Sequence, residues 1–290
     1  MHPIDTYIQS LRDTMKGADP VLVQDAVFDA TEHLTGALDE LLKKSPQSDP
    51  IVLAREAIAR YGSPEEIASA YGKSATPITA APAPSRSLLG RFFGVIADKR
   101  AWGALLYLLI SLGTGIFYFT WVVTGASLSL GLMVLVIGLP FLGVFLLSVR
   151  GIALFEGRLV EWLLGSRMPR HPIIDGTKKG WWEQFKGWIS DRYTWSAMGF
   201  FVLMLPLGVI YFSLMVTFMS TSAALVAAPF VYSILHHEVI QIHHLGYVVE
   251  PWVYYLLPLV GIILFFSTLH LAKALGRLQA FTAKAMLVKG

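Results

Sequence analysis

Apolar residues fill two long stretches of the chain almost without interruption. Residues 101–149 contain no Asp, Glu, Lys or Arg, and residues 193–272 contain only Glu238 and Glu250. About 20 consecutive apolar residues let a helix cross a bilayer, and a helix is needed because lipid offers no partner to unpaired backbone groups. The pattern predicts an all-α membrane domain with four spans, near residues 101–123, 128–149, 195–219 and 251–272.

The first 73 residues have the pattern of a small soluble helical bundle instead. Apolar side chains recur there at helical spacing, and Asp-Pro or Ser-Pro pairs precede three of the predicted helices. We expect helices near residues 3–16, 20–44, 51–61 and 64–72. Because about 70 residues bury only a thin core, we expect domain 1–73 to gain support from a partner surface or from self-association. Residues 74–86 are rich in Ala, Pro, Ser and Thr and are predicted to form a linker.

The membrane domain, 87–290, repeats itself. Aligning residue n with residue n + 93 pairs identical residues at distinctive positions: Trp102 with Trp195, Gly115 with Gly208, and Tyr118 with Tyr211. The match resumes at n + 118, which indicates an insertion near 220–250 in the second copy. We therefore expect two tandem hairpins, about 87–166 and about 180–287, as in other duplicated membrane proteins.

Two kinds of segment surround the predicted spans. Residues 88–98 and 181–191 combine aromatic and aliphatic side chains with basic ones, which is typical of amphipathic helices lying at the membrane interface. Ser220–Leu235 is apolar enough to suggest a fifth span. An odd number of spans would place the basic C-terminal residues outside, so we expect this segment to be re-entrant or to lie on the surface.

The charge distribution predicts the orientation in the membrane. Residues 1–73 carry 12 acidic and 7 basic side chains, whereas all 16 later basic residues fall within 74–100, 150–192 or 273–290. Lys and Arg accumulate on the cytoplasmic side, and the N-terminus lacks the pattern of a cleavable signal peptide. We expect a multi-pass protein of the cell (inner) membrane with both termini in the cytoplasm.

A cluster of histidines is the most conspicuous polar feature of the predicted external segment. Imidazoles with a carboxylate suit Zn²⁺ or Cu²⁺, and free imidazoles respond to pH near neutrality. The alternative is a polar cap between apolar segments. A metalloprotease is disfavoured because Gln241 stands where the second histidine of an HExxH motif belongs. The candidate metal ligands are His236, His237, Glu238, His243 and His244.

Equivalent polar residues of the two copies offer a second candidate site. Tyr118 and Tyr211, with Thr124 and Thr217, could line a shared ligand cavity, or they could serve helix packing. The predicted spans lack the buried charges that mark ion pathways. The chain also has no cysteine, no phosphate loop and no nucleophile triad, so nothing in it indicates an enzyme or a required cofactor.

Two stretches resemble known bacterial modules. Residues 1–72, through EHLTGALDELL and AREAIARYGSPEEIASAYG, resemble the helical signalling domain HAAS, related to the DUF1700 proteins. Residues 98–166, through DKRAWGALLYLLISLGTGIFYFTWVVTGASLSLGL and RGIALFEGRLVEWLLG, resemble the membrane Sensor domain found in front of histidine kinases, and the second copy continues the resemblance to about residue 287. These families supply a role but no agreed ligand or catalytic residues.

The resemblance implies a non-catalytic membrane sensor or signalling adaptor. No kinase sequence occurs within the 290 residues, so the output is expected to pass through a partner protein such as a transcriptional regulator, a kinase or a transporter. The chain could also form a homo-oligomer, and direct nucleic acid binding is not expected. The alternatives are a transporter or transport accessory subunit and, with less support, a metal-dependent membrane enzyme that uses the external histidines.

Overall fold

The computed structural model describes residues 2–75, 87–134, 138–169, 187, 189–235, 241–242, 247–248 and 251–288. Helices make up nearly all of this part of the chain, which confirms the predicted all-α class. The exception is a two-residue antiparallel pair, β1 (Gln241–Ile242) and β2 (Tyr247–Val248), in which Gln241 lies opposite Val248.

The N-terminal bundle consists of α1 (Pro3–Thr14), α2 (Pro20–Lys44), α3 (Pro50–Tyr61) and α4 (Pro64–Ala75). Asp19 and Asp49 cap α2 and α3 by accepting hydrogen bonds from the backbone N–H of the second residue of each helix, at 3.0 and 2.9 Å. Gly62 ends α3 with a φ of +111°, a backbone conformation that side chains with a Cβ rarely adopt. The sequence predicts these four helices correctly.

This bundle has a hydrophobic core of its own. The stripe along α2 contributes Ala26, Ala30 and Leu34, which pack against Ile4 and Leu11 of α1. The tyrosines at its edge are hydrogen-bonded rather than loose, since Tyr7 donates to the Gly62 carbonyl oxygen at 3.0 Å and Tyr71 donates to the Asp29 carboxylate. A separate core is what an independently folding domain requires.

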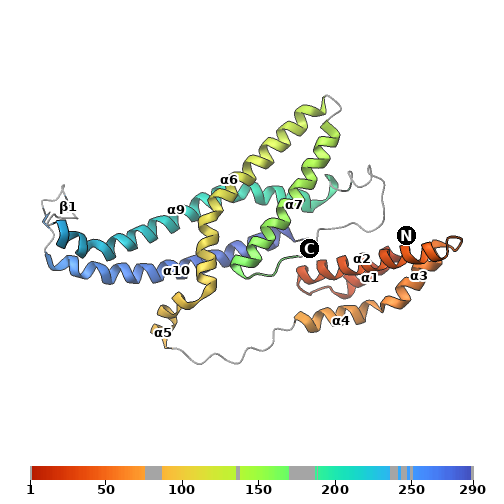
Figure 1. Ribbon diagram of the computed structural model, residues 1–290, viewed down its shortest axis with the longest axis horizontal. Helices are drawn as coiled ribbons and strands as arrows, with labels where there is room; N and C mark the ends of the chain where they lie inside the picture. Colours follow the sequence, from red (N-terminus) through yellow and green to blue (C-terminus); the bar gives the residue numbers. More distant parts are fainter. Residues whose placement is uncertain are drawn as a thin grey trace.

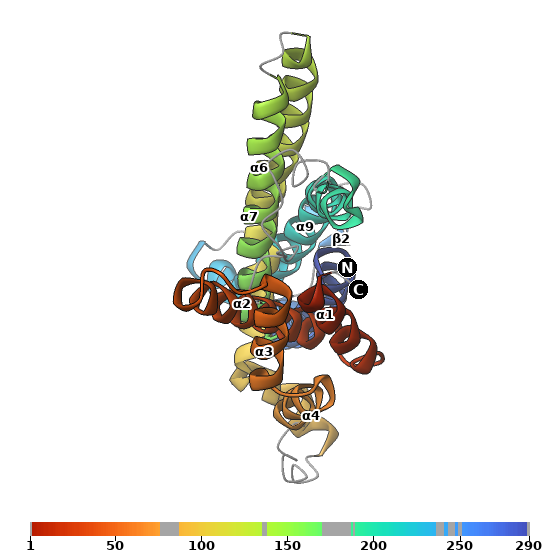
Figure 2. The same ribbon diagram turned by 90° about the vertical axis from the view of Figure 1, so that its right-hand side faces the viewer.

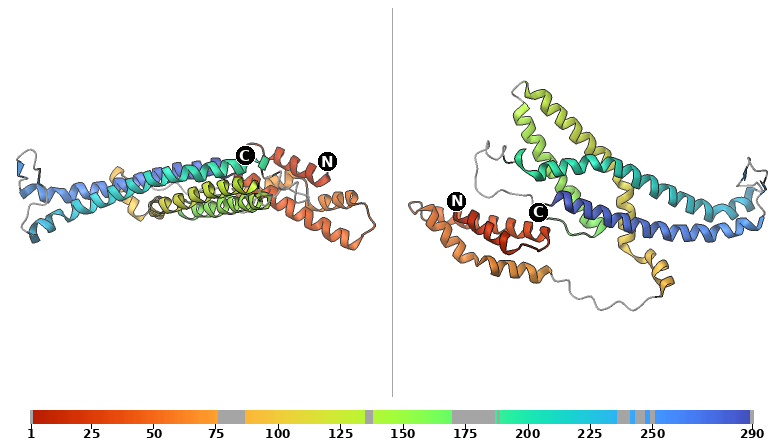
Figure 3. Two further views of the ribbon diagram at one scale, coloured as in Figure 1. Left: turned by 90° about the horizontal axis from the view of Figure 1, so that it is seen from above. Right: turned by 180° about the vertical axis from the view of Figure 1, so that it is seen from behind.

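The membrane domain contains two long helical hairpins that cross (Figure 1). The first pairs α6 (Lys99–Met133) with α7 (Gly138–Leu164), and the second pairs α9 (Arg192–Leu235) with α10 (Pro251–Leu287). Within the described residues, these four helices are long and apolar enough to cross a membrane. In both views of Figure 3, α9 and α10 lie side by side along most of their length.

The predicted position of the first turn was wrong. We expected it near 124–128, but α6 continues to Met133 and the connection to α7 falls after Val134. Small residues allow this: the Phe145 ring of α7 packs where a Cβ on Gly125 would stand, and Ser129 donates to the Gly125 carbonyl oxygen at 2.6 Å. The second span is therefore Gly138–Leu164 rather than 128–149.

Ser220–Leu235, which we expected to be re-entrant or to lie on the surface, is not separated from the preceding helix. It continues α9, which runs for 44 residues through Pro206 and Pro229. Where this segment lies relative to the membrane stays a prediction. Packing against α10 supports the extension, because Ser222 donates to the Gly261 carbonyl oxygen at 2.8 Å and the Gly261 α-carbon leaves room for the Ser222 backbone. At 1.5 Å per residue, α9 is about 66 Å long and exceeds the roughly 30 Å of a bilayer core.

The first predicted interfacial helix is divided in two. It forms α5 (Leu88–Phe93) and the 3₁₀ helix η1 (Gly94–Ala97), while most of the second, 181–191, lies outside the described residues. The two copies nevertheless share one hydrogen bond between a tryptophan near the helix start and the segment that precedes the helix. Trp102 donates to the Ile96 carbonyl oxygen at 2.9 Å, and the equivalent Trp195 donates to the Ile189 carbonyl oxygen at 2.8 Å.

The hairpins meet where α6 crosses α9, at the glycines that the repeat pairs. A Cβ on Gly115 would lie 2.6 Å from the Met204 carbonyl oxygen, and a Cβ on Gly208 would lie 2.4 Å from the Ser111 carbonyl oxygen. Ser111 and Met204 are themselves n and n + 93. Such reciprocal contacts are those that an internal two-fold rotation between the copies produces, and they bring the first and third spans together at the paired glycines.

The N-terminal bundle lies at one end of the membrane helices, beside the C-terminus of α10 (Figure 1). Figure 2 shows the α6–α7 hairpin projecting far beyond the bundle in the other direction.

Candidate functional site: the polar core of the crossing hairpins

A buried carboxylate lies at the centre of the membrane domain. Glu156 of α7 has no solvent-exposed surface. Two hydroxyl groups of α6 donate to it, Tyr107 to Oε1 at 2.5 Å and Tyr118 to Oε2 at 2.8 Å. A buried charge is costly unless its oxygens accept hydrogen bonds, and here both oxygens do.

The hydrogen bonds continue from the first hairpin into the second. Gln279 of α10 places its amide nitrogen 3.4 Å from the Tyr107 hydroxyl oxygen and 3.3 Å from the Met204 sulfur. Its amide oxygen accepts from the Tyr211 hydroxyl at 3.2 Å. All four membrane helices thus contribute to one buried polar cluster, which we call the polar core: Tyr107, Tyr118, Glu156, Met204, Tyr211 and Gln279.

The polar core lies deep along the helices. Tyr107 and Tyr118 stand roughly 12 and 28 Å beyond the start of α6 at 1.5 Å per residue, and both reach Glu156. Since the bilayer core is about 30 Å thick, a carboxylate between these two side chains lies at membrane depth. The expectation that the spans lack buried charge was wrong, because α7 continues through Glu156 to Leu164.

The two copies are equivalent here in a register that the sequence alignment missed. Buried positions of α7 recur in α10 at n + 123 rather than at the predicted n + 118, so Arg150 corresponds to Lys273 and Glu156 to Gln279. The matching buried positions are 146, 149, 153, 156, 157 and 160 in α7 and 269, 272, 276, 279, 280 and 283 in α10.

This register shows that the polar core is chemically asymmetric. Tyr118 and Tyr211 are equivalent and each donates to the residue at the Glu156 or Gln279 position. The equivalent of Tyr107 is Phe200, which is fully buried and has no hydroxyl group. The first copy thus holds an ionisable half-site, and the second holds a neutral version of it.

Two ion pairs join the copies near the starts of α6 and α9. Arg150 of the first copy binds Asp191 at 2.9 Å and Thr194 at 3.2 Å, while Lys273 of the second binds Asp98 at 2.5 Å. In each pair the cation of one copy binds the aspartate of the other copy, as an internal two-fold rotation predicts. The hydrogen bond from Lys273, with the Arg100 backbone N–H, holds the pKa of Asp98 below its ordinary value despite partial burial.

The N-terminal bundle docks on the membrane domain through the start of α2. Lys284 of α10 binds Asp19 at 2.6 Å, Arg167 lies 3.7 Å from Asp25, and Val21 between them is fully buried against the membrane-domain core. Burial raises the pKa of Asp19, but hydrogen bonds from Lys284 and the Val21 N–H outweigh it and hold that pKa below its ordinary value. We call Asp19, Val21, Asp25, Arg167 and Lys284 the docking contact.

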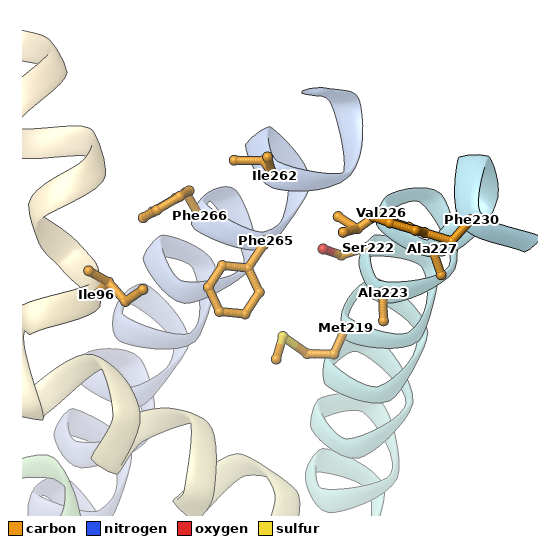
Figure 4. Close-up of a pocket in the computed structure, with 10 residues that line it drawn as sticks. All are labelled: Ile96, Met219, Ser222, Ala223, Val226, Ala227, Phe230, Ile262, Phe265 and Phe266. Carbon is orange, nitrogen blue, oxygen red and sulfur yellow. The ribbon is translucent and has the colours of Figure 1, made fainter. Parts of the chain in front are cut away.

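An apolar groove of about 580 Å³ separates α9 from α10 near the 3₁₀ helix η1 (Figure 4). Phe265 of α10 faces Met219 and Val226 of α9 across it, whereas Phe266 points toward Ile96 on the other side of α10. The hydroxyl group of Ser222 at its wall is already hydrogen-bonded within the protein. The size is that of a ligand pocket, and the lining suits a hydrocarbon rather than a polar molecule.

The structure brings together some of the predicted site residues and separates others. Tyr118 and Tyr211 are buried in the polar core, whereas Thr124 and Thr217 are exposed on the outer faces of α6 and α9 and do not join them. A ligand site formed by Tyr118, Tyr211, Thr124 and Thr217 stays a prediction.

The predicted metal ligands, His236, His237, Glu238, His243 and His244, lie outside the described residues. Within the described part of the chain, no group of His, Asp and Glu is arranged to hold a metal ion. A zinc or copper site at these histidines stays a prediction.

Sequence reasoning missed Glu156, Tyr107 and Gln279. The signal was present, since the buried stripe Val149, Ala153, Glu156 and Val160 has helical spacing. The expected span ends at residue 149 because the basic residue Arg150 follows it, so Glu156 falls outside the predicted membrane helix.

These features define a helical membrane protein with a small helical bundle docked at one end of its spans. The profile of the Sensor family, described as "Putative sensor", matches residues 107–287, and the chain belongs to this family. The HAAS profile matches residues 6–70. No curated protein and no solved structure matches the chain.

Proposed function

We propose that the chain is a membrane sensor that relays a change in the packing of its crossing hairpins to the N-terminal bundle of helices α1 to α4, which we call the HAAS bundle. The docking contact carries this proposal, because it links the start of α2 directly to α10 and to the segment that follows α7. Both hairpins thus end at the HAAS bundle. The family memberships support a signalling role, and the relay is the form that this structure favours.

The geometry suggests how a change within the membrane would reach the bundle. α6 and α9 touch backbone to backbone at Gly115 and Gly208, so a rotation there is not absorbed by flexible side chains. Such a rotation displaces the ends of α7 and α10 relative to each other. Because Arg167 and Lys284 stand at those ends, it changes the spacing of the two cations that hold Asp25 and Asp19.

The HAAS bundle then faces the cytoplasm, where its partner resides. The basic residues gathered at the bundle's end of the spans support this orientation. Released from the docking contact, the acidic start of α2 becomes available to a transcriptional regulator, a kinase or a transporter. The chain itself acts without catalysis, and the groove of Figure 4 offers a site for an apolar stimulus such as a lipid chain.

A substitution far from the docking contact tests the relay. Gly115→Leu forces α6 away from α9, and we expect faster amide hydrogen exchange at residues 19–26 of the full chain in liposomes. Gly113→Leu is the matched control, because a Cβ at Gly113 meets nothing within 4 Å. Equal exchange in both variants and in the parent would show that the crossing and the bundle are uncoupled.

A transporter is the second candidate function, because a carboxylate buried among membrane helices is a common element of proton pathways. A flux measurement separates the two. The sensor proposal expects no proton or substrate movement when the purified chain is the only protein in the liposomes. Sustained flux that Glu156→Gln abolishes would favour the transporter.

A further inference from the structure

We infer that Glu156 is a proton-binding site whose occupancy rearranges the hydrogen bonds between the two hairpins. The juxtaposition that carries the inference is a fully buried carboxylate bound by two tyrosine hydroxyls at membrane depth, beside a second half-site that uses an amide instead. The inference does not rest on the proposed relay, since proton binding is measurable without the HAAS bundle's response.

The internal duplication supplies a comparison within one chain. At the equivalent place in the second copy, Gln279 accepts a hydrogen bond from Tyr211 and packs among the same helices. An amide therefore suffices to fill the space and satisfy a tyrosine. A carboxylate adds a second acceptor oxygen, which Tyr107 uses where the second copy has Phe200, and the ability to gain and lose a proton, at the cost of burying a charge in its ionised form. Packing alone does not account for Glu156.

The groups facing Glu156 have no fixed charge. α6 presents the hydroxyls of Tyr107 and Tyr118 to the carboxylate. One hydrogen bond further away, the Gln279 amide of α10 contacts the Tyr107 hydroxyl and the Met204 sulfur of α9. No cation is hydrogen-bonded or ion-paired to the carboxylate in the described part of the chain. The charge of Glu156 is thus stabilised by hydrogen bonds alone, which a single proton changes.

Binding a proton disturbs this arrangement in a defined way. The ionised carboxylate accepts from both tyrosines, whereas a protonated one carries an O–H that must donate. If it donates to the Tyr107 oxygen, the Tyr107 proton must turn to another acceptor. The Gln279 amide, whose nitrogen lies 3.4 Å from that oxygen, can offer its own oxygen there only after a rotation. Gln279 then has to rotate, which weakens its bond to Tyr211. One proton in the first copy thereby changes a contact between α9 and α10.

A thin barrier separates the site from the surface. Tyr118, whose hydroxyl binds Glu156, also lines a groove of about 470 Å³ between α6 and α7. The other walls are apolar or small, including Gly113 and Gly151. A swing of one aromatic side chain is enough to expose the carboxylate to a proton donor in this groove.

Infrared difference spectroscopy tests the inference on the full chain in liposomes. As the pH is lowered, we expect the parent to develop a protonated-carboxyl band that Glu156→Gln lacks and that the matched control Glu161→Gln keeps. Glu161 lies on the same helix, is partly exposed and pairs with Arg158. Spectra of Glu156→Gln that equal those of the parent throughout the titration would overturn the inference.

A second variant decides the matter if Glu156→Gln does not fold. Tyr118→Phe removes one donor to the ionised form, so the midpoint of the titration should move to higher pH by about one to two units. An unchanged midpoint would overturn the site.

The coupling between proton binding and hairpin packing is measured with spin labels attached at Val134→Cys and Ile234→Cys. The distance between the labels should change over the same pH range and stay constant in Glu156→Gln. A distance that ignores the titration would overturn the coupling.

Discussion

At the scale of single residues, glycines decide how closely the two hairpins approach. Gly115 and Gly208 face carbonyl oxygens of the opposite helix, whereas Gly113 and Gly131 face open space on the same α6. Close backbone approach through small residues is the usual way that membrane helices associate, since lipid removes most of the hydrophobic driving force. The duplication could identify the equivalent pair from the sequence, but only the structure separates contact glycines from lipid-facing ones.

Gly115→Ala should weaken the crossing of α6 and α9. The added Cβ would lie 2.6 Å from the Met204 carbonyl oxygen, and backbone on both sides cannot yield without separating the helices. We expect a thermal unfolding midpoint well below that of the parent in detergent. Gly113→Ala should leave it unchanged or raise it, because alanine favours helices by about 1 kcal/mol over glycine. Equal midpoints for the two variants would contradict the contact.

Leu34→Asp should unfold the N-terminal bundle. Leu34 is almost completely buried in a core that does not involve the membrane helices, and a carboxylate there must give up its hydration. In the isolated fragment 1–75, we expect loss of the helical circular dichroism signal. The control is Val52→Asp at an exposed position of α3. A Leu34→Asp fragment that melts like the Val52→Asp fragment would place the core elsewhere.

At the scale of helices, length is what the sequence predicted least well. Hydropathy correctly indicated four spanning helices, and the caps at Asp19 and Asp49 marked the starts of α2 and α3. The end of α6 was missed because Gly, Ser and Thr near residue 125 also occur in turns, although in a membrane they equally favour helix contacts. The polar core depended on the same lengths, since Glu156 enters the membrane only if α7 continues past Arg150.

Asp191→Asn should destabilise the junction of α7 with α9. Arg150 and Asp191 are nearly buried, so replacing the Asp191 carboxylate removes the charge that faces Arg150, at a cost of about 3–5 kcal/mol. Glu161→Gln breaks the more exposed Arg158 pair and should cost less than about 1 kcal/mol. Denaturant unfolding of both variants in detergent measures the difference. Comparable losses of unfolding free energy in the two variants would show that water already compensates the charges of the Arg150–Asp191 pair.

At the scale of the whole molecule, the central feature is that both hairpins and the HAAS bundle meet at one end. The first 73 residues are acidic and the remainder is basic, which suits an electrostatic contact, although the sequence did not lead us to predict one. The residues that form it could not be predicted. Asp19 was recognised as a helix cap, and only the fold shows that its second carboxylate oxygen binds Lys284.

Acid should release the bundle from the membrane domain. The pKa of docked Asp19 lies below the ordinary value of 3.8, chiefly because Lys284 and the Val21 N–H outweigh the effect of burial. A depressed pKa stabilises docking fully above 3.8, and this contribution is lost as the pH falls through the lower docked value. Limited proteolysis near residue 20 should therefore accelerate in acid for the parent. An Asp19→Asn variant should be cleaved quickly at every pH, and protection of this variant at neutral pH would contradict the prediction.

Zero-length carbodiimide coupling of the unmodified chain in its membrane tests the docking contact most directly. It joins a carboxylate to an amine only where the two already touch, and the Asp98–Lys273 pair within the membrane domain serves as the internal standard. Mass spectrometry should find the Asp19–Lys284 peptide alongside the standard, and Asp19→Asn should remove only the former. Recovery of the Asp98–Lys273 peptide without any Asp19–Lys284 peptide would contradict a sensor whose bundle rests on its membrane helices.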